Sequence, residues 1–138
     1  MKPKIELKPM VYESERTREI LAHDVIDGIE FYIVSLGTHP CAYIYVSPRN
    51  PISRMSSEFS WSDLSEKIIC HGGVTWFDSC LPDNKRYSAG KWLGWDYAHA
   101  WDWIGGGNYC LTDSKKWTTE EIFEEVRNVI AQVKRYEG

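Results

Sequence analysis

The sequence predicts an α+β fold, a mainly antiparallel sheet of about five strands with one C-terminal amphipathic helix packed on it. Three observations lead to this prediction. Short segments alternate apolar and polar residues, which is typical of half-buried strands. One long segment near the C-terminus instead repeats its apolar residues at helical spacing. The chain has 138 residues, 43% of them hydrophobic, which is enough for one core.

Local composition predicts an N-terminal arm, the first turn of the sheet and the positions of its strands. Residues 1–17 carry Pro3, Pro9 and many charges, so we expect an extended N-terminal arm before a single α+β domain over 18–138. Asp27-Gly28 lies between two apolar runs, which indicates a tight hairpin turn. We expect one or two helical turns over 61–67 and strands near 18–26, 29–36, 41–46, 70–77 and 91–97.

The C-terminal helix is predicted over 119–135. Thr118 and Glu121 have the spacing of a capping box. Glutamates early in the segment and Lys134 and Arg135 late in it complement the helix dipole. The apolar face that should dock on the sheet consists of Ile122, Phe123, Val126, Val129, Ile130 and Val133.

Charge and composition exclude several function classes. A net charge of −4 argues against general nucleic-acid binding, which needs a basic face. No segment resembles a signal peptide or approaches ~18 consecutive apolar residues, so we expect a cytoplasmic protein without a membrane span. The four cysteines form no C-x-x-C pair and are expected to be free buried thiols. Seven Trp and eight Tyr need a core, a flat ligand or a homo-oligomeric interface through exposed rings.

Two segments carry residues that could form a site. If 70–77 and 91–99 pair as an antiparallel hairpin, His71 lies opposite Tyr97 to His99. Two histidines and two carboxylates could hold a divalent metal or act as general acid and base, and the two glycines would leave room for a ligand. The residues brought together would be His71, Gly72, Gly73, Asp96, His99 and Asp102.

The alternation of side chains along a strand leaves open whether these residues form one site. On a regular strand, Asp96 and Asp102 face one side and His99 the other, whereas a helical turn after Tyr97 would let the three converge. A structural role is the further alternative, with His99 bonded to backbone groups inside an aromatic core. Basic residues that could bind an anion, or simply be solvated, are Arg49 and Arg54 in a long loop over 47–60, and Lys85, Arg86 and Lys91 further on.

Residues 70–102 combine two short motifs. His71-Gly72-Gly73-Val74-Thr75-Trp76 has the form H-G-G-aliphatic-T-aromatic, and Gly94-Trp95-Asp96-Tyr97-Ala98-His99 with Asp102 has the form G-aromatic-D-x-A-H-x-x-D. The pair of motifs resembles a group of short phage and prophage proteins, over about a quarter of the chain. The resemblance implies a phage or prophage origin and places His71, Asp96, His99 and Asp102 in one unit. It implies no particular activity.

Three functions fit these observations. The first is a phage- or prophage-encoded binding protein in the host cytosol. Its pocket, closed by the 47–60 loop, would take a nucleotide-like or other small anionic ligand, such as a host signal that it sequesters. The second is a metal-dependent hydrolase in which His71, His99, Asp96 and Asp102 hold the metal and activate water. The third is an oligomeric accessory protein without a ligand site. We favour the first and lean towards a protein without enzymatic activity. The residues establish no cofactor, and a divalent metal at His71, Asp96, His99 and Asp102 stays open.

Overall fold

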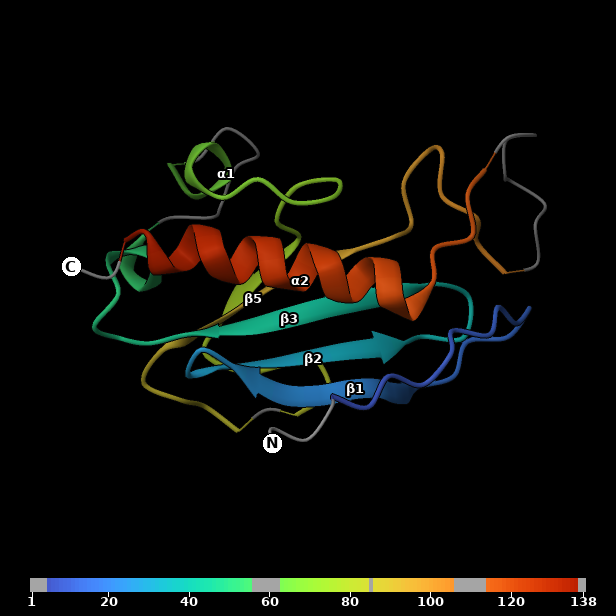
Figure 1. Cartoon of the computed structure of the whole chain (residues 1–138), viewed down its shortest axis with the longest axis horizontal. Helices are drawn as coiled ribbons and strands as arrows, with labels where there is room; N and C mark the ends of the chain where they lie inside the picture. Colours follow the sequence, from blue (N-terminus) through green and yellow to red (C-terminus); the bar gives the residue numbers. More distant parts are fainter. Residues whose placement is uncertain (1–4, 56–62, 85, 106–113, 137–138) are drawn as a thin grey trace.

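The computed structural model describes residues 5–55, 63–84, 86–105 and 114–136 (Figure 1). Its centre is an antiparallel sheet of five strands in the order β1-β2-β3-β5-β4, and the long helix α2 packs on it. The predicted α+β class is therefore confirmed. The elements are β1 (Glu19–Ile26), β2 (Ile29–Ser35), β3 (Pro40–Val46), η1 (Pro51–Arg54), α1 (Asp63–Lys67), β4 (Trp76–Asp78), β5 (Lys91–Asp96) and α2 (Thr119–Lys134).

The turn between β1 and β2 is the one that the Asp27-Gly28 pair predicts. Both residues have positive φ, 52° and 82°, as a type I′ hairpin turn requires. Pairing begins directly beside it at Ile26↔Ile29. The strands predicted near 18–26, 29–36, 41–46 and 91–97 are confirmed to within about one residue at each end.

The strand predicted over 70–77 is wrong for most of its length. β4 covers only its end, and Cys70 to Gly73 form a turn in which the N–H of Gly73 donates to the carbonyl of Cys70 at 3.0 Å. The φ values of Gly72 and Gly73, +68° and +83°, lie in the left-handed region that glycine adopts without strain. The His-Gly-Gly motif is therefore a turn, because its glycines take conformations that do not belong to a strand.

β5 ends at Asp96, and the chain then turns. The Oδ1 of Asp96 accepts a hydrogen bond from the backbone N–H of Ala98 at 3.1 Å, the local bond with which aspartates begin turns. A second turn follows, in which the N–H of Asp102 donates to the carbonyl of His99 at 2.9 Å. The segment after Tyr97 is thus neither the continued strand nor the regular helix that the sequence left open.

Helix α2 matches its prediction, ending one residue earlier. Thr118 and Glu121 form the predicted capping box, each side chain accepting the other residue's backbone N–H. No helix that the structure describes is long and apolar enough to cross a membrane. The buried face of α2 consists of Ile122, Val126, Val129, Ile130 and Val133, and it joins a core that includes Phe31, Ile33, Ala42, Ile44, Leu93 and Trp95.

The alternate residues of the same strands form the opposite face of the sheet, which we call the outer face. The register places Tyr43 beside Gly94 and Tyr45 beside Trp92, so aromatic rings gather on it. Residues 79–84 and 86–90 run along this face, where the N–H of Gly90 donates to the Tyr45 hydroxyl at 2.9 Å. One face of the sheet is therefore an aliphatic core under a helix, and the other is an aromatic surface beside a loop.

The N-terminal arm lies against the domain. The described part, 5–18, contains no helix or strand. The N–H of Lys8 donates to the carbonyl of Leu21 at 2.8 Å, and the Tyr12 hydroxyl donates to the carbonyl of Trp117 at 2.8 Å. These bonds fasten the arm beside β1 and the start of α2.

Candidate functional site

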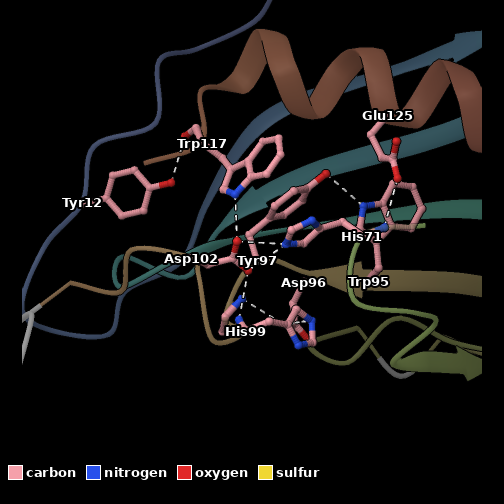
Figure 2. A network of polar contacts seen from close by, with 10 residues as sticks. Tyr12, His71, Trp95, Asp96, Tyr97, His99, Asp102, Trp117 and Glu125 are labelled. Atoms are coloured by element: carbon pink, nitrogen blue, oxygen red, sulfur yellow. Dashed lines mark hydrogen bonds and ion pairs between the residues drawn. The ribbon is translucent and has the colours of Figure 1, made fainter. Parts of the chain in front are cut away.

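The carboxylate of Asp102 is the centre of a polar network between the sheet and α2 (Figure 2). Asp102 is only 3% exposed. Its Oδ1 accepts from the Nε1–H of Trp117 at 2.8 Å, and its Oδ2 accepts from the backbone N–H of His99 at 2.9 Å. The Nε2 of His71 lies 2.9 and 2.8 Å from the same two oxygens. Donors from three residues thus surround a buried carboxylate, which lowers the cost of burying its charge.

His71 is held in this network by its backbone and by its ring. Its backbone N–H donates to Oε1 of Glu125 on α2 at 3.0 Å. Its imidazole stacks on the ring of Tyr97, with centroids 4.5 Å apart and planes inclined by 12°, and meets Trp117 edge to face at 4.9 Å. The side chain is still 25% exposed, so part of the imidazole is open to solvent.

The contact with Asp102 decides which imidazole nitrogen of His71 is unprotonated. A carboxylate only accepts hydrogen bonds, so the neutral ring carries its proton on Nε2 and leaves Nδ1 as an acceptor. A histidine oriented in this way serves as a general base when a nucleophile lies within hydrogen-bond reach. Among the described residues, His71 bonds to Asp102 and Glu125, which provide no hydroxyl or thiol. Asp102 therefore orients His71 as a general base would be oriented, but no described nucleophile forms a hydrogen bond with it.

His99 links this network to Asp96. The Nε2 of His99 lies 3.2 Å from Oδ1 of Asp96, at an angle that makes no hydrogen bond, and within the described chain this buried nitrogen has no hydrogen-bond partner. The backbone of Gly72 packs against it, since a Cβ at position 72 would lie 2.0 Å from Nε2. The His-Gly-Gly turn and His99 therefore fit together only because residue 72 has no side chain.

The structure brings only some of the predicted residues together. His71 and Asp102 form a pair beside α2, whereas Asp96 lines a pocket on the outer face with Cys41 and Tyr43. His99 lies between this pair and Asp96, with its ring centroid 5.6 Å from that of His71. The predicted proximity of the two histidines is therefore present, although the paired residues of β4 and β5 stop short of both histidines and each histidine lies in a turn.

These side chains do not fit a metal centre. Within the ranges that the structure describes, no group of three or more His, Cys, Asp or Glu side chains is arranged to hold a metal ion. The oxygens of Asp102 already accept hydrogen bonds from three residues, and Asp96 stands on the far side of His99. This arrangement does not support the metal-dependent hydrolase, so we derive no step through a metal.

An open cleft of about 390 Å³ lies at the His71 ring. Its wall is the first half of α2, which contributes three carboxylates, and Trp117 stands beside them. Sequence reasoning missed these residues because the capping box and the helix dipole already explain acidic residues at a helix start. We call this the His71 cleft, and its lining residues are His71, Tyr97, Trp117, Glu121, Glu124, Glu125 and Asn128.

A lysine already occupies the rim of the His71 cleft. The Nζ of Lys115 lies 3.9 Å from the ring centroid of Trp117 and 2.5 Å from Oε2 of Glu121. The hydrogen bond from this ammonium is the main cause that lowers the pKa of Glu121. The rim therefore shows an ammonium group held between an aromatic face and a carboxylate.

The predicted basic residues of the 47–60 loop lie elsewhere. Asn50, between Arg49 and Arg54, caps η1, and its Nδ2 donates to a carbonyl in the last turn of α2 at 3.0 Å. Glu125, which contacts the His71 turn, lies roughly 12 Å earlier along the helix axis. The described part of the loop, 47–55, is thus fastened to the far end of α2, and 56–60 lie outside the described residues.

Cys41 and Cys70 offer no reactive thiol to this site. Cys41, Cys70 and Cys80 are free and buried, as the sequence predicts, and Cys110 lies outside the described residues. Burial raises the pKa of Cys70 to about 12 and that of Cys41 to about 11. Both remain thiols at neutral pH, and the thiolate is the nucleophile.

Comparison with protein-family models, with curated proteins and with solved structures found no match to this chain.

Proposed function

We propose that this chain is a small-ligand-binding protein, encoded by a phage or prophage, whose His71 cleft takes an organic cation such as an ammonium or guanidinium group. The lining of the cleft carries the proposal, because it combines three carboxylates with two aromatic rings and a partly exposed imidazole. The phage origin is supported by the resemblance of residues 70–102 alone.

The chemistry of the lining favours a cation in two ways. A carboxylate attracts positive charge directly, and the face of a tryptophan ring attracts it through its quadrupole. Lys115 provides an internal example, since its ammonium contacts Trp117 and Glu121 together. A ligand ammonium in the cleft would have Glu124 and Glu125 as further carboxylate partners.

The charge of this cleft argues against the anionic ligand that the sequence led us to expect there. Its lining contains three glutamates and no lysine or arginine. Glu121 is paired with Lys115, and Glu124 with Arg127 at 3.3 Å, but among the described residues Glu125 accepts only a backbone N–H, that of His71. An anion in the cleft would face uncompensated negative charge, which disfavours it.

The test uses three probes of one shape and different charge: benzylammonium, benzyl alcohol and benzoate. Binding is followed by NMR through the indole Nε1–H of Trp117, which donates to Asp102 and reports on the cleft. We expect benzylammonium to bind saturably with a dissociation constant on the order of 1 mM, as suits a small fragment. The alcohol should bind several-fold more weakly, and benzoate not at all.

Two variants make the test specific. Glu125→Gln removes the charge but keeps an oxygen for the N–H of His71, and it should weaken benzylammonium binding about 2- to 5-fold. Lys115→Gln removes the internal competitor and should strengthen it. Glu120→Gln, in the first turn of the same helix but outside the cleft lining, is the matched control. Equal responses to benzylammonium and benzoate, or equal effects of Glu125→Gln and Glu120→Gln, would contradict the proposal.

A further inference from the structure

A second pocket lies on the outer face of the sheet, on the side away from α2. It has a volume of about 340 Å³, within the usual range of small-molecule sites. One wall comes from residues 81–84 and 86–88, and strands β2, β3 and β5 form the floor. We call it the outer pocket, and the lining residues that matter here are Tyr32, Tyr45, Arg86, Tyr87 and Trp92.

The floor of the outer pocket is aromatic because of strand alternation. Tyr45 and Trp92 are directly paired across β3 and β5, and their ring centroids are 5.2 Å apart at an interplanar angle of 59°. Tyr32 on β2 meets Trp92 at 5.6 Å and 58°. The tilted rings leave apolar surface facing the pocket, onto which a planar group could pack.

The wall adds a positive charge. Arg86 and Tyr87 line the pocket and are both exposed, Tyr87 by 72%. Neither side chain forms a hydrogen bond or ion pair with a residue that the structure describes. The one carboxylate in the lining, Glu30, is paired with His23 at 2.6 Å. The lining of the outer pocket therefore includes an arginine, which the lining of the His71 cleft does not.

A fixed backbone presents this wall. The N–H of Gly90 donates to the Tyr45 hydroxyl, and a Cβ at position 90 would lie 2.1 Å from the carbonyl oxygen of Val46, so the loop end is pressed onto β3. At the other end the N–H of Ser88 donates to the carbonyl of Ser79 at 2.9 Å. The side chains at 86 and 87 therefore project from a segment whose ends are anchored.

We propose that the outer pocket binds a nucleotide or a similar planar aromatic anion. Its base would pack on the rings of Tyr45, Tyr87 and Trp92, and its phosphate would pair with the guanidinium of Arg86. Stacking accepts any base, and an arginine matches phosphate geometry with two parallel N–H donors. The inference does not depend on the function proposed for the His71 cleft.

The test compares AMP, adenosine and inorganic phosphate by calorimetry and by the NMR signal of the Trp92 indole. We expect AMP to bind more tightly than either part, because both the rings and the arginine take part. Tyr87→Ala should weaken AMP about 5- to 100-fold, the range of one lost base–aromatic stack. Arg86→Gln should weaken AMP about 10-fold and leave adenosine unchanged.

Matched controls are available on exposed residues outside this pocket. Trp101→Ala removes another exposed ring, and Arg54→Gln removes another exposed arginine, and neither should change AMP binding. The proposal is overturned if AMP does not bind. It is also overturned if phosphate alone binds as tightly as AMP, or if the control variants weaken AMP as much as Tyr87→Ala and Arg86→Gln do. A change at the Trp117 indole without one at Trp92 would assign AMP to the His71 cleft and would equally reject the outer pocket.

Discussion

The two pockets differ most in how their side chains are held. In the His71 cleft, the polar side chains form hydrogen bonds within the protein. The carboxylate of Asp102, for example, accepts from His71, His99 and Trp117. In the outer pocket, Arg86 and Tyr87 reach solvent from an anchored backbone. A residue of the first kind supports the fold as well as lining a site. Loss of binding after its substitution therefore has two explanations, a damaged fold or a lost contact, whereas loss after substitution of Arg86 or Tyr87 has only the second.

Their sequence origins differ as well. Tyr32, Tyr45 and Trp92 gather because alternate residues of antiparallel strands share a face. The His71 cleft instead joins a glycine turn, a turn after β5 and the start of a helix that comes much later in the chain. Its lining therefore depends on how these three parts pack, which no local pattern specifies.

Replacing Asp102 is expected to have the largest effect on stability. Asp102→Ala leaves donors of His71, His99 and Trp117 without an acceptor in a buried position, and it should cost about 3–5 kcal/mol of unfolding free energy. Urea denaturation measures this loss. Asp24→Ala, exposed on β1 and bonded only to the adjacent N–H of Val25, should cost under about 0.5 kcal/mol. Equal losses for both variants would show that the network does not hold the domain together.

The two glycines after His71 form a matched pair with the next largest effect. Both have positive φ, so an alanine at either position carries a conformational penalty of about 1–2 kcal/mol. At Gly73 nothing else lies within 4 Å of the added Cβ, whereas at Gly72 it would meet the His99 ring at 2.0 Å. Gly72→Ala should thus exceed Gly73→Ala by roughly 1–3 kcal/mol in urea denaturation. The difference between the two variants should shrink when His99 is also replaced by alanine. If it persists in that background, the Cβ of residue 72 collides with something other than the His99 ring.

Much of the fold follows from local sequence signals. Asp27-Gly28 determines the first hairpin through its two positive φ values, and Thr118 with Glu121 determines where α2 begins. The error at 70–77 arose because apolar and aromatic residues there have strand-like composition, while Gly72 and Gly73 require left-handed backbone. Conformational freedom at two glycines outweighed the pattern of their neighbours.

The candidate site was only partly predictable for a physical reason. The proximity of His71 and His99 could be inferred because the two segments flank the β4–β5 pairing. The separation of Asp96 from Asp102 could not, since it depends on where β5 ends, and a side-chain bond from Asp96 to the N–H of Ala98 decides that. The contribution of Glu125 required the docking of α2, which is tertiary packing rather than local preference.

Substitutions in the outer pocket should leave stability nearly unchanged, which sharpens the contrast with Asp102. Tyr87 is 72% exposed, and the Arg86 side chain has no polar partner among the described residues. Tyr87→Ala and Arg86→Gln should therefore each change the unfolding free energy by less than about 0.5 kcal/mol. A loss above about 1 kcal/mol in thermal or urea unfolding would mean that these residues also support the fold, and the two pockets would then differ less than we infer.

The smallest expected effect concerns His39, which lines the outer face beside Asp96. Burial lowers the pKa of His39, and Arg16 and His99 add to this, while Asp96 and Asp102 oppose it. The unfolded chain therefore binds the proton near pH 6.5 more readily than the folded protein does, so stability falls as pH drops below that value. Wild type should lose more unfolding free energy between pH 7 and pH 5 than His39→Gln, whose side chain does not titrate. Groups common to both proteins cancel in the difference between the two urea-denaturation series. Parallel series would mean that folding does not penalise the charge on His39.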